Sequence, residues 1–416
     1  MRSNCAIRKN SGGRRGRRSG FVMLTAGLLF VGLIGFLGLA FDVGYLEWTR
    51  RRLQIAADSA AAAGAQELQR GAASRITAAA RSDSALNGAT HGAGGVTVTV
   101  NHPPASGAYA GDSVAVEAIV AQNAPLFFLT VFGSSTTTVK ARAVARLSSG
   151  PNCVYVMNPE GSKTFALNGS VVINLGCGTV INSSDPAAMY LNGSVIWNGP
   201  SNVVGGYETV GSVIWNPTPT TGVEPENDPL AYLAPPAYGA CTENRFSVSN
   251  NATLQPGVYC DGIKIAGSGV ITFSPGEYVL LGGGLSVNGS SILNGTGVSF
   301  YLTEDATHAY GPISLAGSAV STLTAPTTGD MAGILFYQDR SILSPAPSII
   351  AGSSNSTFVG ALYFPTSALT YSGSSNGQYT ILVANTLTYS GSATVGSNYS
   401  GLPGGSPMKS TVVVAE

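Results

Sequence analysis

The chain has 416 residues, of which 21 are basic, 21 are acidic and 54 are glycine. A charged share of 10%, with 44% apolar residues, excludes an intrinsically disordered chain, which would be polar and highly charged. Three histidines and five cysteines leave little material for a multi-metal or redox enzyme. Residues 1–150 carry 16 basic and 7 acidic groups (net +9), whereas residues 151–416 carry 5 and 14 (net −9). Two different kinds of protein are therefore joined in one chain.

The N-terminus predicts a membrane anchor. The basic leader, residues 1–20, is followed by an uncharged run, residues 21–41, that is long enough to cross a hydrocarbon core of about 30 Å. The leader holds seven cations: Arg2, Arg8, Lys9, Arg14, Arg15, Arg17 and Arg18. Because seven cations outweigh Arg50, Arg51 and Arg52 beyond the run, we expect a cytoplasmic N-terminus and an exported remainder. A cleaved secretory signal is the second alternative, although no A-x-A site follows the run.

Residues 42–150 predict a stalk helix and a small sheet. From Val43 to about Gln69, apolar and small residues recur every three or four positions and form a narrow stripe. Residues 96–100, 113–120 and 136–147 are rich in β-branched residues and predict three strands. Residues 123–132 are a candidate for a short apolar helix. A membrane helix, a continuing helix and a small antiparallel sheet is the plan of a pilin-like subunit.

An ordered series of short motifs lies at residues 38–65, where the uncharged run meets the stalk helix. It comprises Asp-Val-Gly-Tyr, Arg-Leu-Gln and Ala-Ala-Asp followed by an alanine run. The signature residues are Asp42, Gly44, Leu53, Gln54, Ala57 and Asp58. Over residues 19–66 the chain resembles the Tad domain of TadE/TadG-like proteins of the tight-adherence (Flp) pilus-assembly system. The resemblance implies an envelope component of pilus biogenesis at the bacterial inner membrane, with other pilus-assembly or pilin-like subunits as partners, and no catalysis.

Two features differ from related proteins. Pilins that are cut by a prepilin peptidase have a glutamate five residues into the mature chain. The candidate cleavage site Gly20–Phe21 has Thr25 at that place, which favours an uncleaved anchor. The chain also lacks the Asp-x-Ser-x-Ser metal motif that some TadG-type proteins carry, so no metal is expected.

Residues 151–416 contain a repeated pattern that predicts strands. Leu-Asn-Gly-Ser-Val occurs at 167–171 and 191–195, and where successive copies of the pattern are close, their glycines lie 18 to 28 residues apart. Shorter copies occur at 210–212, 266–268, 288–290, 316–318, 351–353, 372–374 and 390–392. A period of about 20 residues with β-branched runs between turns favours a right-handed parallel β-helix, a β-solenoid. An antiparallel β-sandwich is the alternative.

A Pro-rich excursion, residues 216–238, interrupts the period. It contains Glu224, Glu226 and Asp228, so an acidic, solvated insertion is favoured over a binding loop.

The cysteine spacing predicts two disulfides. Cys153 and Cys177 lie 24 residues apart, and Cys241 and Cys260 lie 19 apart, which is about one repeat. In an oxidising compartment these pairs would join neighbouring repeats. Zinc is the competing hypothesis, but the sequence has no C-x-x-C pair and no histidine near these cysteines. Cys5 would stay cytoplasmic and reduced.

The alternative function is a membrane-anchored β-helix that binds or cleaves carbohydrate, with glycans as partners. Cleavage needs paired acids or a calcium site with a basic group nearby. The densest titratable groups are Glu304, Asp305 and His308, and then Asp339 and Arg340. Neighbouring acids on a strand point to opposite faces, and Asp339–Arg340 is expected to be a salt bridge. We therefore expect no catalytic residue and no cofactor, and five cations after residue 150 are too few for nucleic acid.

Overall fold

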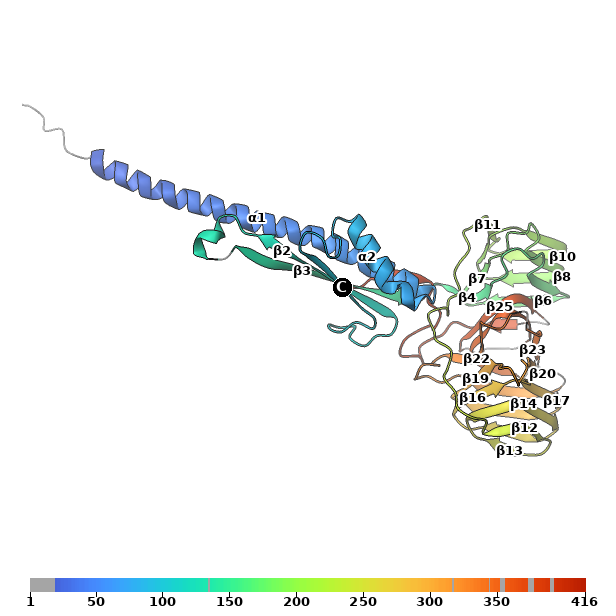
Figure 1. The fold of residues 1–416 in the computed structure, drawn as a ribbon. Helices are drawn as coiled ribbons and strands as arrows, with labels where there is room; N and C mark the ends of the chain where they lie inside the picture. Colours follow the sequence, from blue (N-terminus) through green and yellow to red (C-terminus); the bar gives the residue numbers. More distant parts are fainter. Residues whose placement is uncertain are drawn as a thin grey trace, which may run out of the picture. The chain divides into compact units, whose positions relative to one another are not determined.

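The computed structural model describes residues 19–133, 135–315, 318–343, 345–351, 356–372, 378–389 and 393–416. Most of the basic leader, Cys5 and the repeat glycines at 317, 352, 373 and 391 lie outside the described residues. The chain divides into two compact units. The first unit takes in the residues up to Ala63, Thr77–Val144 and Val414–Glu416. The second unit takes in Gly64–Ile76 and Ala145–Val413. The protein is mainly β, with an N-terminal apolar helix (Figure 1).

The uncharged run and the stalk form one continuous helix, α1 (Ser19–Gln69). A helix of 51 residues is about 75 Å long. Over its first half large apolar side chains are exposed, whereas the predicted stalk stripe is buried at Thr49, Leu53, Ala56 and Ala60. The periodic pattern therefore located the buried stripe, and the uncharged run located the exposed part of the helix. The helix breaks at Gly71, and a second helix, α2 (Ile76–Leu86), follows the short turn η1 (Ala73–Arg75).

A small sheet belongs mainly to the first unit. Its order is β1–β2–β3–β27, and β1 pairs antiparallel with β2. The bounds are β1 Val96–Asn101, β2 Ala115–Pro125, β3 Thr136–Ser148 and β27 Thr411–Val414. The three predicted strands are thus confirmed. The predicted helix over 123–132 is wrong except for one 3-10 turn, η2 (Leu129–Phe132), because β2 continues to Pro125. In Figure 1, β2 and β3 run beside α1.

The second unit holds one large sheet of short strands. From β4 to β13 the strands are Asn152–Val156, Phe165–Asn168, Val171–Leu175, Gly178–Ile181, Met189–Asn198, Ser201–Val203, Tyr207–Asn216, Thr220–Thr221, Glu243–Val248 and Ala252–Leu254. From β14 to β20 they are Gly257–Gly267, Val270–Phe273, Gly276–Leu281, Leu285–Gly289, Ile292–Thr296, Val298–Thr303 and Ile313–Leu315. From β21 to β26 they are Val320–Thr324, Ile334–Gln338, Ser348–Ala351, Thr357–Ser372, Thr380–Tyr389 and Ala393–Val395.

Among the described residues of this sheet, all named strands that pair do so in parallel. Most pairs join a strand to another strand that lies about one repeat later in the sequence. This contradicts the antiparallel β-sandwich. The repeat copies lie in register: Asn168 faces Asn192, Gly193 faces Gly211, and Gly267 faces Gly289. A Cβ at Gly193 would meet the carbonyl of Gly169, and the φ of Gly193 is 131°, so only glycine suits this corner.

Side chains of equivalent repeat positions also stack. The Asn198 amide donates to Asn174 at 2.8 Å, and the Asn216 amide donates to Asn198 at 2.9 Å. Inside the sheet, Tyr278, Phe300 and Phe336 stack at 5.3 Å between successive ring centroids, and all three are buried. Aromatic and aliphatic residues at one strand position thus form a continuous core.

The order of the strands in space differs from their order in the sequence. The late strand β25 pairs with β4 and β5, and β26 pairs with β6. Among the described strands, β10 pairs in register only with β8, and β12 pairs in register only with β14. The chain therefore starts in the middle of the sheet, builds to β10, and resumes at β12, at the other end. Residues 222–242, called here the return segment, make that connection.

Candidate functional site

Asp42, a residue of the Tad signature, holds a loop of the first unit against α1. Its carboxylate accepts backbone hydrogen bonds from Phe127 at 3.0 Å, Phe128 at 3.0 Å and Leu129 at 2.7 Å, and the residue is 1% exposed. These amides begin η2, so the carboxylate meets N–H groups that the turn itself leaves without partners. The sequence placed Asp42 at the end of the apolar run but gave no sign of this partner.

The other signature residues join α1 to β3. The Gln54 amide donates to Asp58 at 2.8 Å and to the carbonyl of Arg142 in β3 at 3.0 Å. Leu53 and Ala57 are fully buried. Nothing in the structure explains the glycine at position 44.

A buried carboxylate lies in the sheet of the first unit. Glu117 in β2 is fully buried and accepts from Arg142 Nε at 2.6 Å and Asn101 Nδ2 at 2.6 Å. Arg142 also pairs with Glu416. Burial alone would raise the pKa of Glu117, but the hydrogen bonds from Asn101, Arg142, Ala105 and Ser106 outweigh burial and lower the pKa. A carboxylate that stays charged and fully paired fits a structural role.

The structure contains both predicted disulfides. Cys153–Cys177 and Cys241–Cys260 each have Cα atoms 5.7 Å apart, a separation typical of a disulfide. The fold also brings His308 to Cys241 and Cys260, with the three ligand atoms within 4.8 Å of one another. No histidine lies near these cysteines in the sequence, but the folded chain places His308 beside them. Because the two sulfurs are joined, neither is a thiolate that could bind zinc.

The acids singled out as catalytic candidates are engaged in local turns. Asp305 accepts from the Thr307 backbone at 2.7 Å, from the His308 backbone at 2.8 Å and from His308 Nδ1 at 2.9 Å. The Thr307 hydrogen bonds, followed by those from His308, hold the pKa of Asp305 well below its usual range. Glu304 accepts from the backbone of Tyr310 at 3.1 Å.

Asp339 and Arg340 do not form the expected salt bridge. Asp339 accepts from Tyr301 and Thr303, each at 2.9 Å, and from Ser341. Burial raises the pKa of Asp339, but these hydrogen bonds outweigh it and lower the pKa. Arg340 instead donates to the carbonyls of Ala231 at 2.6 Å and Leu230 at 2.7 Å, in the return segment. Neighbouring residues at a turn point apart, so sequence adjacency misled the prediction.

The return segment contacts successive strands along the sheet. Residues of this segment contact residues in β4, β24, β19 and β14, and they also contact Arg340, which follows β22 in the chain. The contacts are Glu226–Asn152, Asp228–Tyr363, Ala231–Arg340, Tyr238–Tyr301 and Cys241–Cys260. Leu230 is fully buried, and burial raises the pKa of Glu226 although its hydrogen bond from Asn152 lowers it. The prediction of a solvated insertion is therefore wrong for Glu226 and Asp228, which are hydrogen-bonded where the segment packs on the sheet, whereas Glu224 is exposed.

Sequence reasoning missed an electrostatic effect of one acid on another in the second unit. Burial, together with the charge of Asp330, raises the pKa of Glu277, the second residue of β16. Two acids far apart in sequence gave no signal of this interaction.

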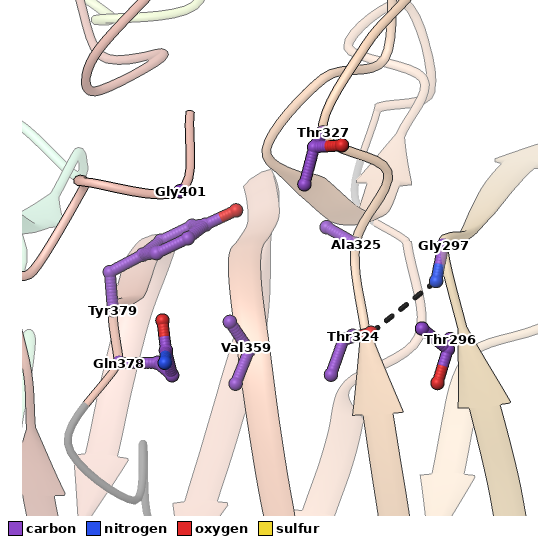
Figure 2. A pocket seen from close by; sticks show the side chains of 9 residues that line it. All are labelled: Thr296, Gly297, Thr324, Ala325, Thr327, Val359, Gln378, Tyr379 and Gly401. Carbon is purple, nitrogen blue, oxygen red and sulfur yellow. Dashed lines mark hydrogen bonds between the residues drawn. The ribbon is translucent and has the colours of Figure 1, made fainter. Parts of the chain in front are cut away.

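A small pocket of about 320 Å³ lies in the second unit, where β18 and β21 end (Figure 2). Gln378 and Tyr379 line one side and Thr296, Gly297 and Thr324 the other, with the Gly297 amide donating to Thr324 at 3.3 Å. Burial, and then the nearby Tyr399, raises the pKa of Tyr379 to about 12. None of the nine lining residues is acidic or basic, so the pocket offers hydrogen bonds without a group that titrates near neutral pH.

One helix among the described residues, at Val22–Gln69, is long and apolar enough to cross a membrane. This supports a single-pass membrane anchor. Neither a curated protein nor a solved structure matches the chain. Residues 20–67 match the Tad family, described as "Putative Flp pilus-assembly TadE/G-like", and this segment contains all six signature residues predicted from the sequence.

Proposed function

We propose that the protein is a membrane-anchored structural component of the bacterial cell envelope that acts in Flp pilus biogenesis or adhesion by packing against other pilus-assembly subunits. The observation that carries the proposal is the Tad match over residues 20–67. The matched segment contains the exposed apolar helix, and within it Asp42 and Gln54 form hydrogen bonds to other parts of the first unit. Residues 21–41 would span the inner membrane, with the N-terminus in the cytoplasm and residues 151–416 in the periplasm or outside the cell.

We further propose that residues 42–150 are a Tad or pilin-like domain and residues 151–416 a right-handed parallel β-helix. The parallel registers between equivalent repeats and the stacked asparagines support the β-helix. Right-handed crossovers are the rule for parallel strands. Such a domain would present a rigid polar surface.

Co-purification tests the proposed role. The tagged full chain, isolated from detergent-solubilised envelope, should bring down pilus-assembly subunits of the Tad system. The control replaces residues 21–41 by an unrelated membrane helix of equal length and keeps the rest of the chain. Recovery of no such subunit with the native chain, while it is present in the extract, would contradict the proposal.

We also propose that the second unit is not an enzyme, because Asp305 and Asp339 are held by hydrogen bonds and the pocket of Figure 2 has no lining group that titrates near neutral pH. The full chain in detergent should not turn over acidic or neutral glycans. Glu304→Gln, Asp339→Asn and Glu277→Gln are the test variants, since general acid–base catalysis contributes about 10²–10⁴-fold. Turnover by the native chain that any of the three variants abolishes would establish the carbohydrate-cleaving alternative.

A further inference from the structure

The loop between β2 and β3, residues 126–133, is unusually apolar for an exposed segment. Its sequence is Leu-Phe-Phe-Leu-Thr-Val-Phe-Gly, and residues 118–139 contain no charged side chain. Phe127 is 49% exposed, Phe128 48% and Val131 85%. Such a patch in water is unfavourable and marks a binding surface.

The loop lies beside the end of the uncharged run of α1. Phe128 packs on Gly38, where a Cβ would come within 2.6 Å of its ring, so this close approach requires glycine. The rings of Phe41 and Phe127 are 5.5 Å apart, and those of Tyr45 and Phe127 are 5.4 Å apart. The loop is therefore continuous with the apolar surface of the helix.

Asp42 would otherwise oppose membrane contact at this place. A bare carboxylate at the edge of a bilayer carries a large desolvation cost. Here three backbone amides of the loop satisfy it, and the side chain is hidden from solvent. The same hydrogen bonds fix the loop against the helix, so one contact both masks the charge and positions the aromatic residues.

We propose that residues 126–133 form a second membrane contact, which inserts into the leaflet where the apolar helix ends. Phe128 reaches Gly38, four residues before Asp42, which corresponds to about 6 Å along the helix. That depth matches interfacial segments, which enter about 5–10 Å, and aromatic residues favour this zone. The lipid bilayer is the occupant because the patch continues the surface of the helix that spans it. This inference rests on the proposed membrane anchor.

Site-specific labelling tests the proposal. The variant Val131→Cys is made in the full chain that also carries Cys5→Ser, and the new cysteine is labelled with an environment-sensitive fluorophore. The labelled protein is reconstituted in vesicles of phosphatidylethanolamine and phosphatidylglycerol. Leu86→Cys is the matched control, because Leu86 in α2 is an equally exposed apolar residue at 82%. We expect lipid-attached nitroxide to quench the label at position 131 several-fold more than at 86, and aqueous iodide to do the reverse.

Flotation of the vesicles separates the two hypotheses. If the chain does not float with lipid, the membrane anchor itself is wrong, and the loop proposal falls with it. If it floats but iodide quenches both positions equally, the anchor stands and the loop proposal is overturned. Protection of position 131 from both quenchers would indicate a protein partner or a second copy there, and would also overturn it.

Discussion

Replacing Arg340 by methionine is expected to lower the free energy of unfolding of the second unit by about 3–5 kcal/mol. The guanidinium donates to three carbonyls of the return segment, those of Leu230, Ala231 and Leu233, and to the hydroxyl of Tyr337. It also faces the rings of Tyr337 and Tyr363. Methionine fills much of the volume but removes all four hydrogen bonds. The Ala231 carbonyl loses its guanidinium donor, whereas the carbonyls of Leu230 and Leu233 each keep one donor, the Leu233 backbone amide and the Tyr337 hydroxyl.

Urea denaturation, followed by tryptophan fluorescence, measures this change. Arg245→Met is the matched control, because Arg245 is 82% exposed and its one ion pair, to Asp261 at 3.0 Å, is on the surface. Such a pair contributes about 0–1 kcal/mol. Equal losses in the two variants would contradict the role given to Arg340.

Removing the Cys241–Cys260 disulfide by replacing both cysteines with serine is expected to cost about 3 kcal/mol. The bond closes a loop of 19 residues and ties the end of the return segment to β14. Its loss increases the conformational freedom of the unfolded chain and also releases this end in the folded state. Cleavage by a protease within residues 234–241 should therefore become faster.

Non-reducing peptide mapping provides the independent check. The native chain should yield the pairs Cys153–Cys177 and Cys241–Cys260, and Cys5→Ser should leave both the map and the stability unchanged. Free thiols at all four positions, or zinc bound to Cys241, Cys260 and His308, would overturn the assignment.

The repeated strand pattern of the second unit was predictable from the sequence. The order in which its strands lie in the sheet was not. The repeat glycines set the corners, so Gly193 and Gly211 could be aligned from the sequence alone. The pairing of β25 with β4 joins residues more than 200 positions apart, and no periodicity contains that information. Residues 222–242 make a connection that is needed only because of this order of the strands in space. From the sequence alone, their acids therefore seemed to belong to a solvated insertion.

The contacts of the first unit show the same limit. The stripe through Leu53 and Ala57 could be derived from helical spacing, because burial repeats every three to four residues. The partners of Asp42 and Glu117 lie elsewhere in the chain, and a single carboxylate in a sequence does not reveal which amides or guanidinium it will meet. The signature residues were found by resemblance, and their physical roles only by geometry.

Membrane topology shows whether the second unit is exported. A reporter that is active only in the periplasm and one that is active only in the cytoplasm are each fused after Glu416 and, as a control, before Met1. Because seven cations precede Phe21, we expect the periplasmic reporter to be active after Glu416 and the cytoplasmic reporter to be active before Met1. Cytoplasmic activity after Glu416, with the periplasmic reporter silent there, would contradict an exported second unit and the envelope role built on it.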